Sequence, residues 1–215
     1  PYARVALIGL ALCDEPRRML VVGLGGGTLP RFLHKHYRGA TIDAVDIDPD
    51  VVHVSKAYFG FREDERMHAH VADGRAFVEQ TRDPYDIIFL DAFGTSSVPA
   101  HMTTQEFLVA VRRALRPDGV VVGNVWSGAH NVLYDAMVRT YQEVFETVKV
   151  VPVGGTGNRI VLALPRKDGV ATEALARRAR RLADSKKFDF DLGAAAADQP
   201  AHEREAIRAA RVLRD

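Results

Sequence analysis

The 215-residue chain has one cysteine, Cys13, and no apolar run close to the ~20 residues that cross a bilayer. A single cysteine excludes an internal disulfide framework and is typical of a reducing cytoplasm. Net charge is also small, because 29 Lys and Arg stand against 28 Asp and Glu. This balance does not favour nucleic acid as a partner. We therefore expect a cytoplasmic protein with no nucleic-acid partner and no membrane segment within this chain.

The sequence also lacks the phosphate-binding loop G-x-x-x-x-G-K-[ST]. In its place, a glycine turn follows the apolar run at 19–22 and precedes a helical pattern, and its glycines are Gly23, Gly25, Gly26 and Gly27. Such a strand, turn and helix start form a binding device, because a ligand can lie against the bare backbone and the helix N–H groups. The absence of lysine favours a ligand with little negative charge, such as adenosine attached to a sulfonium amino acid.

Short apolar runs alternate with helical patterns along most of the chain. The expected strands are 19–22, 41–45, 67–71, 86–90, 120–125, 147–153 and 159–164, and the expected helices are 2–12, 28–37, 49–58, 74–80, 104–115, 130–145 and two within 170–215. This alternation predicts an α/β fold, a doubly wound and mostly parallel seven-stranded sheet covered on both faces. The hairpin-like residues 154–158 predict one antiparallel strand near the C-terminus. A turn is expected at 117–119. The domain would span 1–165, and a helical extension would span 166–215.

Polar residues follow the first five expected strands, at the edge where doubly wound sheets bind ligands. Asp46 lies 19 residues after Gly27 and can accept hydrogen bonds from both ribose hydroxyls. Ile47 belongs to the same expected nucleoside site. The alternative is that Asp46 only caps the turn into the next helix, although Asp48, with Pro49 behind it, is the better N-cap candidate.

Asp73 and Asp91 end the third and fourth expected strands. Asp73, with Gly74, could accept a hydrogen bond from the exocyclic amine of adenine, or could simply cap its helix. Asp91 could orient an ammonium group and accept its proton, or could simply cap the strand end.

Four side chains are candidates for an acceptor pocket: Tyr2, Phe93, His101 and Trp126. Core packing is an equally good explanation for Trp126. His68 and His70 share one face of the third expected strand, but no third ligand is spaced to join them. We therefore expect no metal.

Four motifs, VVGLGGGTLPRFL, AVDIDPDVV, VADGRAFV and DIIFLDAF, resemble in order and spacing the spermidine synthase family of polyamine aminopropyltransferases. The resemblance covers about residues 1–164 and implies the Rossmann-like fold of class I S-adenosylmethionine-dependent methyltransferases. It also implies that the glycine turn holds the nucleoside and its amino-alkyl tail, that Asp46 binds the ribose, and that Asp73 and Gly74 face the adenine. Asp91 occupies the position of the family's catalytic aspartate.

Two subgroups carry closer resemblances. LDAFGTSSVPAHMTTQEF is similar to a bacterial spermidine-synthase-like branch, whereas GLGGGTLP and DAVDIDP resemble a lysine methyltransferase domain that acts on a translation elongation factor. The chain also departs from true spermidine synthases. Gly26 or Gly27 stands where their glycine motif has an aspartate, and the residues after Asp91 lack their second, diamine-binding aspartate. Tyr2 is followed by Ala-Arg-Val instead of Gln or His and then Glu, and we expect no counterpart of the family's N-terminal β-domain within these 215 residues.

The leading prediction is an alkyl transferase that moves an aminopropyl group from decarboxylated S-adenosylmethionine to an amine of the polyamine class. The runner-up is an S-adenosylmethionine-dependent methyltransferase acting on an amine or protein, which the missing second aspartate strengthens. A non-catalytic nucleoside-binding domain is a third hypothesis. The acceptor, a homodimeric state, and any domain or membrane segment before Pro1 are left open.

Overall fold

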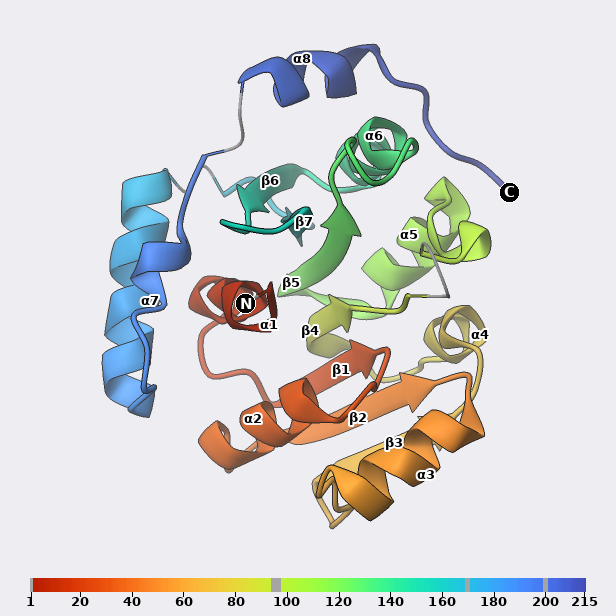
Figure 1. Cartoon of the computed structure of the whole chain (residues 1–215), viewed down its shortest axis with the longest axis vertical. Coiled ribbons are helices and arrows are strands. Elements are labelled where there is room, and N and C mark those ends of the chain that lie inside the picture. Colours follow the sequence, from red (N-terminus) through yellow and green to blue (C-terminus); the bar gives the residue numbers. More distant parts are fainter. Residues whose placement is uncertain (1, 94–97, 169–170, 199–200) are drawn as a thin grey trace.

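One seven-stranded sheet forms the centre of the molecule, with the strand order β3-β2-β1-β4-β5-β7-β6 (Figure 1). The structure, a computed structural model, describes residues 2–93, 98–168, 171–198 and 201–215. The strands are β1 (Arg18–Val22), β2 (Thr41–Asp46), β3 (Met67–Val71), β4 (Tyr85–Leu90), β5 (Leu115–Trp126), β6 (Thr147–Pro152) and β7 (Asn158–Leu164). Pairing is parallel from β3 to β5, and β7 is antiparallel to both β5 and β6. This confirms a mostly parallel sheet with one antiparallel strand near the C-terminus.

Helices cover both faces of the sheet. They are α1 (Tyr2–Ala6), α2 (Thr28–His36), α3 (Pro49–Tyr58), α4 (Gly74–Glu79), α5 (Gln105–Arg113), α6 (Tyr134–Val144), α7 (Thr172–Lys186) and α8 (Ala201–Ala209), with short 3₁₀ helices η1 (Leu7–Leu12), η2 (Ala100–Met102) and η3 (Gly193–Ala195). Buried side chains of α1, η1, α2, α3 and α7 belong to one core, and those of α4, α5, α6 and α8 belong to the other.

Each central strand is apolar on both faces because it supplies both cores. In β1, Met19 and Val21 point into the first core, whereas Leu20 and Val22 point into the second. All six residues of β4 are buried. Continuous apolar runs are the expected signature of parallel strands covered on both sides.

Three segments differ from the sequence-based expectation. The N-terminal α-helix ends at Ala6 and continues as η1, where the backbone of Gly9 lies against β5. A Cβ at Gly9 would stand 2.3 Å from Cγ2 of Val122, so this turn packs through its backbone. The expected turn at 117–119 instead falls within β5, whose pairing with β4 shifts at this point. The expected helix 130–145 also starts later, at Tyr134.

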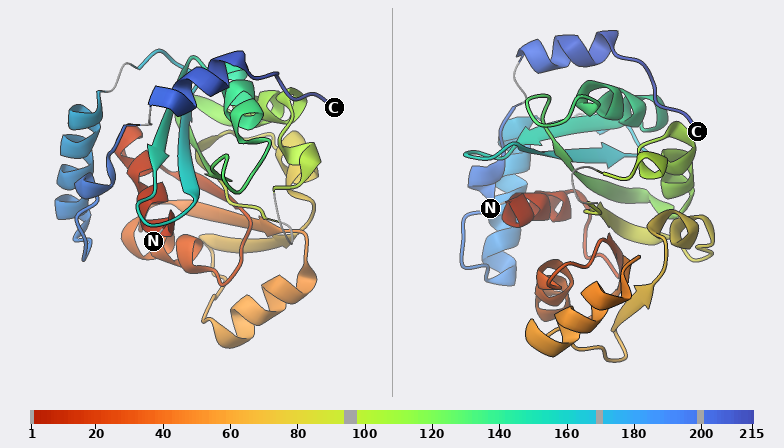
Figure 2. Two further views of the ribbon diagram at one scale, coloured as in Figure 1. Left: turned by 45° about the horizontal axis from the view of Figure 1, so that its top comes forward. Right: turned by 45° about the vertical axis from the view of Figure 1, so that its right-hand side comes forward.

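The two tail helices pack on opposite faces of the sheet. Leu175 and Ala179 of α7 are fully buried beside η1, and Ile207 of α8 is fully buried in the second core. Figure 2 shows α8 lying along α6. The helical extension is therefore part of the packed structure. Within the described residues, no helix combines the length and the apolar character needed to cross a membrane.

Candidate functional site

The glycine turn after β1 touches the end of β4. The N–H of Gly23 donates to the carbonyl of Val45 (2.8 Å), and the backbone φ angle of Gly23 is +99°. A Cβ at this position would stand 2.4 Å from the carbonyl oxygen of Asp91. Only glycine fits here, since a side chain would collide with the neighbouring backbone in a conformation that L-residues avoid.

The rest of the turn leads into α2. Gly27 is the N-cap of this helix, with a φ of +69°, and its missing side chain leaves room for the ring of Phe61. Gly25 also has a positive φ, and a Cβ there would meet nothing within 4 Å. No side chain caps the N-terminus of α2. The open side of Gly25 and the uncapped helix start therefore leave backbone available to a ligand.

Asp46, at the end of β2, organises this turn. Its Oδ2 accepts from the N–H of Leu24 (2.9 Å), and its Oδ1 accepts from the N–H of Asp48 (3.1 Å). Each carboxylate oxygen has a second lone pair, so both can still accept from ribose hydroxyls. Asp48 is the N-cap of α3, accepting from Asp50, as the sequence predicted. Ile47 between them is 66% exposed, a large apolar side chain at the edge of the sheet.

Asp73, after β3, has partners for both carboxylate oxygens. It accepts from the N–H of Ala76 as the N-cap of α4, and it pairs with Nε2 of His101, both at 2.9 Å. Partial burial acts to raise the pKa of Asp73, but these two hydrogen bonds outweigh it and hold that pKa below its usual value. Capping is thus real at this position, and the predicted adenine contact stays a prediction. The sequence assigned His101 to the acceptor, whereas its contact here is with Asp73.

Close packing against β1 requires a residue without a side chain at Gly74. A Cβ on Gly74 would stand 2.5 Å from Cγ1 of Val22 and 3.3 Å from Cε of Met102. The absence of a side chain lets α4 start close to β1, which brings Asp73 to the same edge of the sheet as the glycine turn.

Asp91, after β4, is the most enclosed carboxylate at this edge. Tyr2 of α1 donates to its Oδ2 (3.2 Å), and the amide of Asn124 in β5 donates to its Oδ1 (2.8 Å). Burial raises the pKa of Asp91, and the two donors offset only part of that rise. Burial, followed by the charge of Asp91, raises the pKa of Tyr2 to about 12, so the phenol remains a donor. This carboxylate is suited to accept a proton.

Two aromatic rings lie on the same edge. Phe93 and Trp126 stack with ring centroids 5.4 Å apart, and each is two residues from the hydrogen-bonded pair Asp91 and Asn124. Both rings are partly exposed, so Trp126 is not a core residue. The structure therefore brings Tyr2, Asp91, Phe93 and Trp126 together. Residues 94–97 of the predicted acceptor loop lie outside the described residues.

The sequence did not identify two amides. Asn124 lies within the expected strand 120–125, and Asn158 lies within the hairpin-like residues 154–158. In the structure, Nδ2 of Asn158 donates to Oδ1 of Asn124 (2.9 Å), and Nδ2 of Asn124 donates to Oδ1 of Asp91. The single available signal was the polar character of Asn124 in an otherwise apolar strand.

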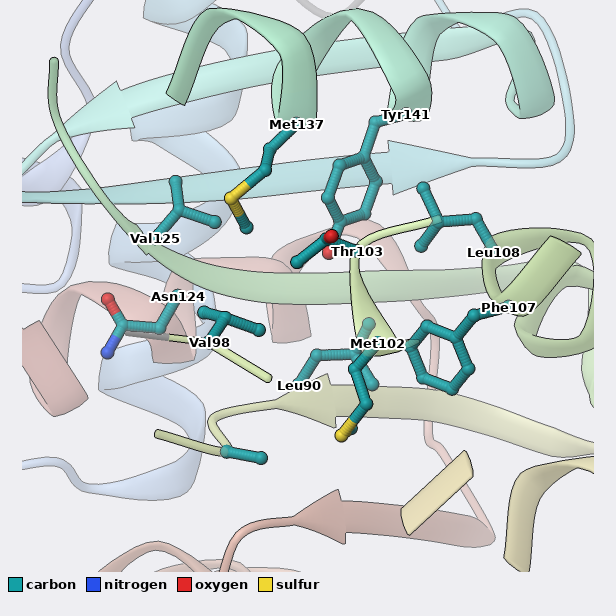
Figure 3. Close-up of a pocket in the computed structure, with 11 residues that line it drawn as sticks. Leu90, Val98, Met102, Thr103, Phe107, Leu108, Asn124, Val125, Met137 and Tyr141 are labelled. Atoms are coloured by element: carbon teal, nitrogen blue, oxygen red, sulfur yellow. The ribbon is translucent and has the colours of Figure 1, made fainter. Parts of the chain in front are cut away.

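A small pocket beside Asn124 has a mainly apolar lining (Figure 3). Leu90, Val98 and Met102 line it from one side, and Met137 and Tyr141 line it from α6. Asn124 and Val125 line it from β5.

His68 and His70 both lie beside the carboxylate of Asp43. Oδ1 of Asp43 lies 2.9 Å from Nε2 of His70 and 3.6 Å from Nδ1 of His68. Across the part of the chain that the structure describes, no group of three or more His, Cys, Asp or Glu side chains is arranged to hold a metal ion.

Known proteins are similar to this chain in sequence and in fold. A polyamine aminopropyltransferase from Vibrio vulnificus (strain CMCP6) is 36% identical over 168 residues, covering 76% of this chain and 56% of that protein. An eEF1A lysine and N-terminal methyltransferase from Bos taurus is 36% identical over 183 residues, covering 80% and 26%. The crystal structure of human methyltransferase-like protein 13 in complex with SAH superposes with a TM-score of 0.78 and 31% identity, covering 88% and 93%.

The chain thus spans 56% and 26% of the two relatives' own lengths. The sequence profile of the spermine/spermidine synthase domain matches residues 3–153, from within α1 to the residue that follows β6. Together these findings place the chain in a family, as the motif resemblance predicted: it belongs to the spermine/spermidine synthase domain family.

Proposed function

We propose that this chain is an aminopropyltransferase domain that moves an aminopropyl group from decarboxylated S-adenosylmethionine to an amine of the polyamine class. The observation that carries the proposal is Asp91, which lies partly buried at the end of β4, accepts hydrogen bonds from two donors and contacts the glycine turn. Family membership and the similarity to a polyamine aminopropyltransferase support it.

The residues at the sheet edge suit the adenosyl donor. Asp46 keeps lone pairs for the ribose hydroxyls, exposed Ile47 offers an apolar surface for the base, and the turn at Gly25 leaves room beside the backbone. The bound donor supplies a carbon activated by its sulfonium, which accepts the new bond as methylthioadenosine leaves with the electron pair of the broken C–S bond.

Asp91 would prepare the attacking amine. A primary ammonium has a pKa near that of lysine, about 10.4, and only the neutral amine can attack carbon. Asp91 would orient the ammonium and accept its proton as the N–C bond forms, and its raised pKa makes it a better base than an exposed carboxylate. Tyr2 and Asn124 keep the carboxylate in place during this transfer.

A second candidate, methyl transfer from S-adenosylmethionine, rests on a specific observation. Among the described residues assigned to the acceptor, Asp91 is the only carboxylate, and the undescribed segment 94–97 reads GTSS. A diamine would bring a second ammonium group to this edge, and a buried ammonium without a partner is costly. The likeness to methyltransferase-like protein 13 favours the same alternative.

One experiment separates these candidates. The protein would be incubated with each donor plus putrescine, spermidine or a protein extract, and the products would be followed by mass spectrometry. Methylthioadenosine formed only with the decarboxylated donor and a polyamine supports the proposal. Formation of S-adenosylhomocysteine would instead identify the reaction as methyl transfer. Binding without either product would leave a non-catalytic nucleoside-binding domain.

Removal of the Asp46 carboxylate should weaken donor binding. We expect Asp46→Ala to lower affinity for S-adenosylhomocysteine or methylthioadenosine about 10- to 100-fold in calorimetric titration, because hydrogen bonds to a charged group contribute roughly 1.5–3 kcal/mol. Asp48→Ala, two residues away, is the matched control. It should lower the free energy of unfolding by about 1 kcal/mol through the lost N-cap, with affinity unchanged. Equal affinity loss in both variants would contradict a ribose-binding role for Asp46.

We also propose a cytoplasmic location, in line with the single cysteine, and a functional division between the transferase domain at 1–165 and the helical extension at 166–215. The burial of Leu175 and Ile207 in the two cores supports an extension that stabilises the sheet domain.

A further inference from the structure

Three polar side chains at the carboxyl edge form one hydrogen-bonded row: Asn158, Asn124 and Asp91. Nδ2 of Asn158 donates to Oδ1 of Asn124 at 2.9 Å, and Nδ2 of Asn124 donates to Oδ1 of Asp91 at 2.8 Å. An ionised carboxylate can only accept, so Asn124 must turn its NH₂ group toward Asp91. Its oxygen then faces Asn158, which must donate.

Because Asn124 is buried, its two hydrogen-bond partners in the row fix the orientation of its amide. Asn124 is 5% exposed, so water offers little replacement for either of its two partners. If the amide of Asn124 turned over, its oxygen would face the carboxylate of Asp91, and its NH₂ would face the NH₂ of Asn158. Both contacts would then join like groups, and the donor to Asp91 would be lost.

Asn158 is held where it can impose this orientation. It is the first residue of β7 and pairs with Trp126 at the end of β5. Its carbonyl accepts from the guanidinium of Arg159 (3.1 Å), which is bound to Glu203 of α8 (2.6 Å). The backbone that carries the amide is therefore fixed by the sheet on one side and by the tail on the other.

We propose that Asn158 is a positioning residue whose amide sets the direction in which Asn124 donates to Asp91. It thereby favours the proton-accepting form of Asp91 without touching the acceptor itself. The relevance to turnover rests on the proposed function, whereas the effect on the carboxylate of Asp91 does not.

The charged and titratable neighbours of the row are few. Tyr2 from α1 is the titratable side chain that contacts Asp91. Across the row, Arg159 on β7 is paired with Glu203 on α8, and His130 in the loop after β5 lies against Gly157. A change at Asn158 therefore reaches Asp91 either through Asn124 or directly through space.

A double-mutant cycle separates these two routes. Asn158→Asp puts an acceptor opposite the oxygen of Asn124 and should turn the amide over, raising the pKa of Asp91 by about one unit. Asn158→Ala removes the donor without adding charge and should raise it less. Carbon-13 NMR titration of the Asp91 carboxyl in the full chain measures both shifts without requiring turnover. The acidic limb of kcat/KM should move to higher pH by the same amount.

The decisive comparison is the Asn124→Ala background, where Asn158→Asp should no longer shift the pKa of Asp91. An equal shift in both backgrounds would mean a direct charge effect and would overturn the positioning role. Asn131→Asp makes the same substitution at an amide bonded to Met137 and Leu133, and should leave the pKa unchanged. If the NMR shifts occur as expected in a protein that turns over no donor, the proposed function fails and the positioning role stands.

Discussion

Asp91→Asn is expected to lower kcat/KM by about 10²- to 10⁴-fold while the protein remains folded, because the substitution removes the proposed proton acceptor but keeps the shape of the side chain. Asn at this position can still orient an amine weakly through its oxygen, but it cannot take a proton. Initial rates with the preferred donor and acceptor, together with thermal unfolding, measure the two effects separately.

The same variant should not lose stability. Burial raises the pKa of Asp91 in the folded state, so the folded protein binds this proton more tightly than the unfolded chain does. Stability from this group therefore falls as pH rises from about 3.9 through the folded pKa, and above that window the buried charge is a net cost. At pH 7 an uncharged Asn removes that cost, and the free energy of unfolding should stay level or rise.

Asp86→Asn is the matched control at the other end of the same strand. Asp86 is 8% exposed and accepts from the N–H groups of Arg17 and Arg18, at 2.7 Å each. Its substitution should lower the free energy of unfolding by about 1–3 kcal/mol and leave kcat/KM close to wild type. Near-normal turnover in Asp91→Asn would instead identify Asp91 as a structural cap of its strand.

Gly23→Ala is expected to lower the free energy of unfolding by about 2–5 kcal/mol. The sum combines about 1–2 kcal/mol for a side chain at positive φ with about 1–3 kcal/mol for overpacking, because the new Cβ would stand 2.4 Å from the Asp91 carbonyl oxygen. Urea unfolding followed by circular dichroism measures the loss.

Gly25→Ala separates the two contributions. Its φ is +49°, yet its Cβ would meet nothing within 4 Å, so it should cost only the backbone strain of about 1–2 kcal/mol. Similar losses in both variants would show that the contact between Gly23 and the end of β4 contributes little.

The sheet was predictable because local pattern and burial agree along most of the chain. The apolar runs in β1 and β4 are buried on both faces, and Asp48 with Pro49 starts α3 as predicted. The element boundaries that were predicted wrongly depend on contacts between residues distant in the sequence. β5 begins at Leu115, earlier than expected, because Leu115 pairs with Tyr85. The 3₁₀ helix η1 packs its backbone on Val122. Neither partner is visible in the local sequence.

The candidate site was predictable one strand end at a time. Asp46, Asp73 and Asp91 each follow a recognisable strand, so topology alone brings them to one edge. The hydrogen-bond partners of these carboxylates could not be predicted from the sequence. His101 contacts Asp73, which lies 28 residues earlier in the chain. Asn158 reaches Asn124 because β7 pairs with β5. Both contacts depend on the folded chain.

The direct contact between Gly23 and the end of β4 has a consequence for evolution and engineering. Gly23 and Asp91 are fixed to each other by adjacent parallel strands, whereas Tyr2 and Trp126 come from α1 and the carboxyl end of β5. Under the proposed function, the donor-binding turn and the proposed base would form one block held by paired strands, whereas the acceptor side would be assembled from separable pieces. Exchanging those pieces between relatives should therefore retarget the enzyme to new amines without rebuilding the block that it inherits.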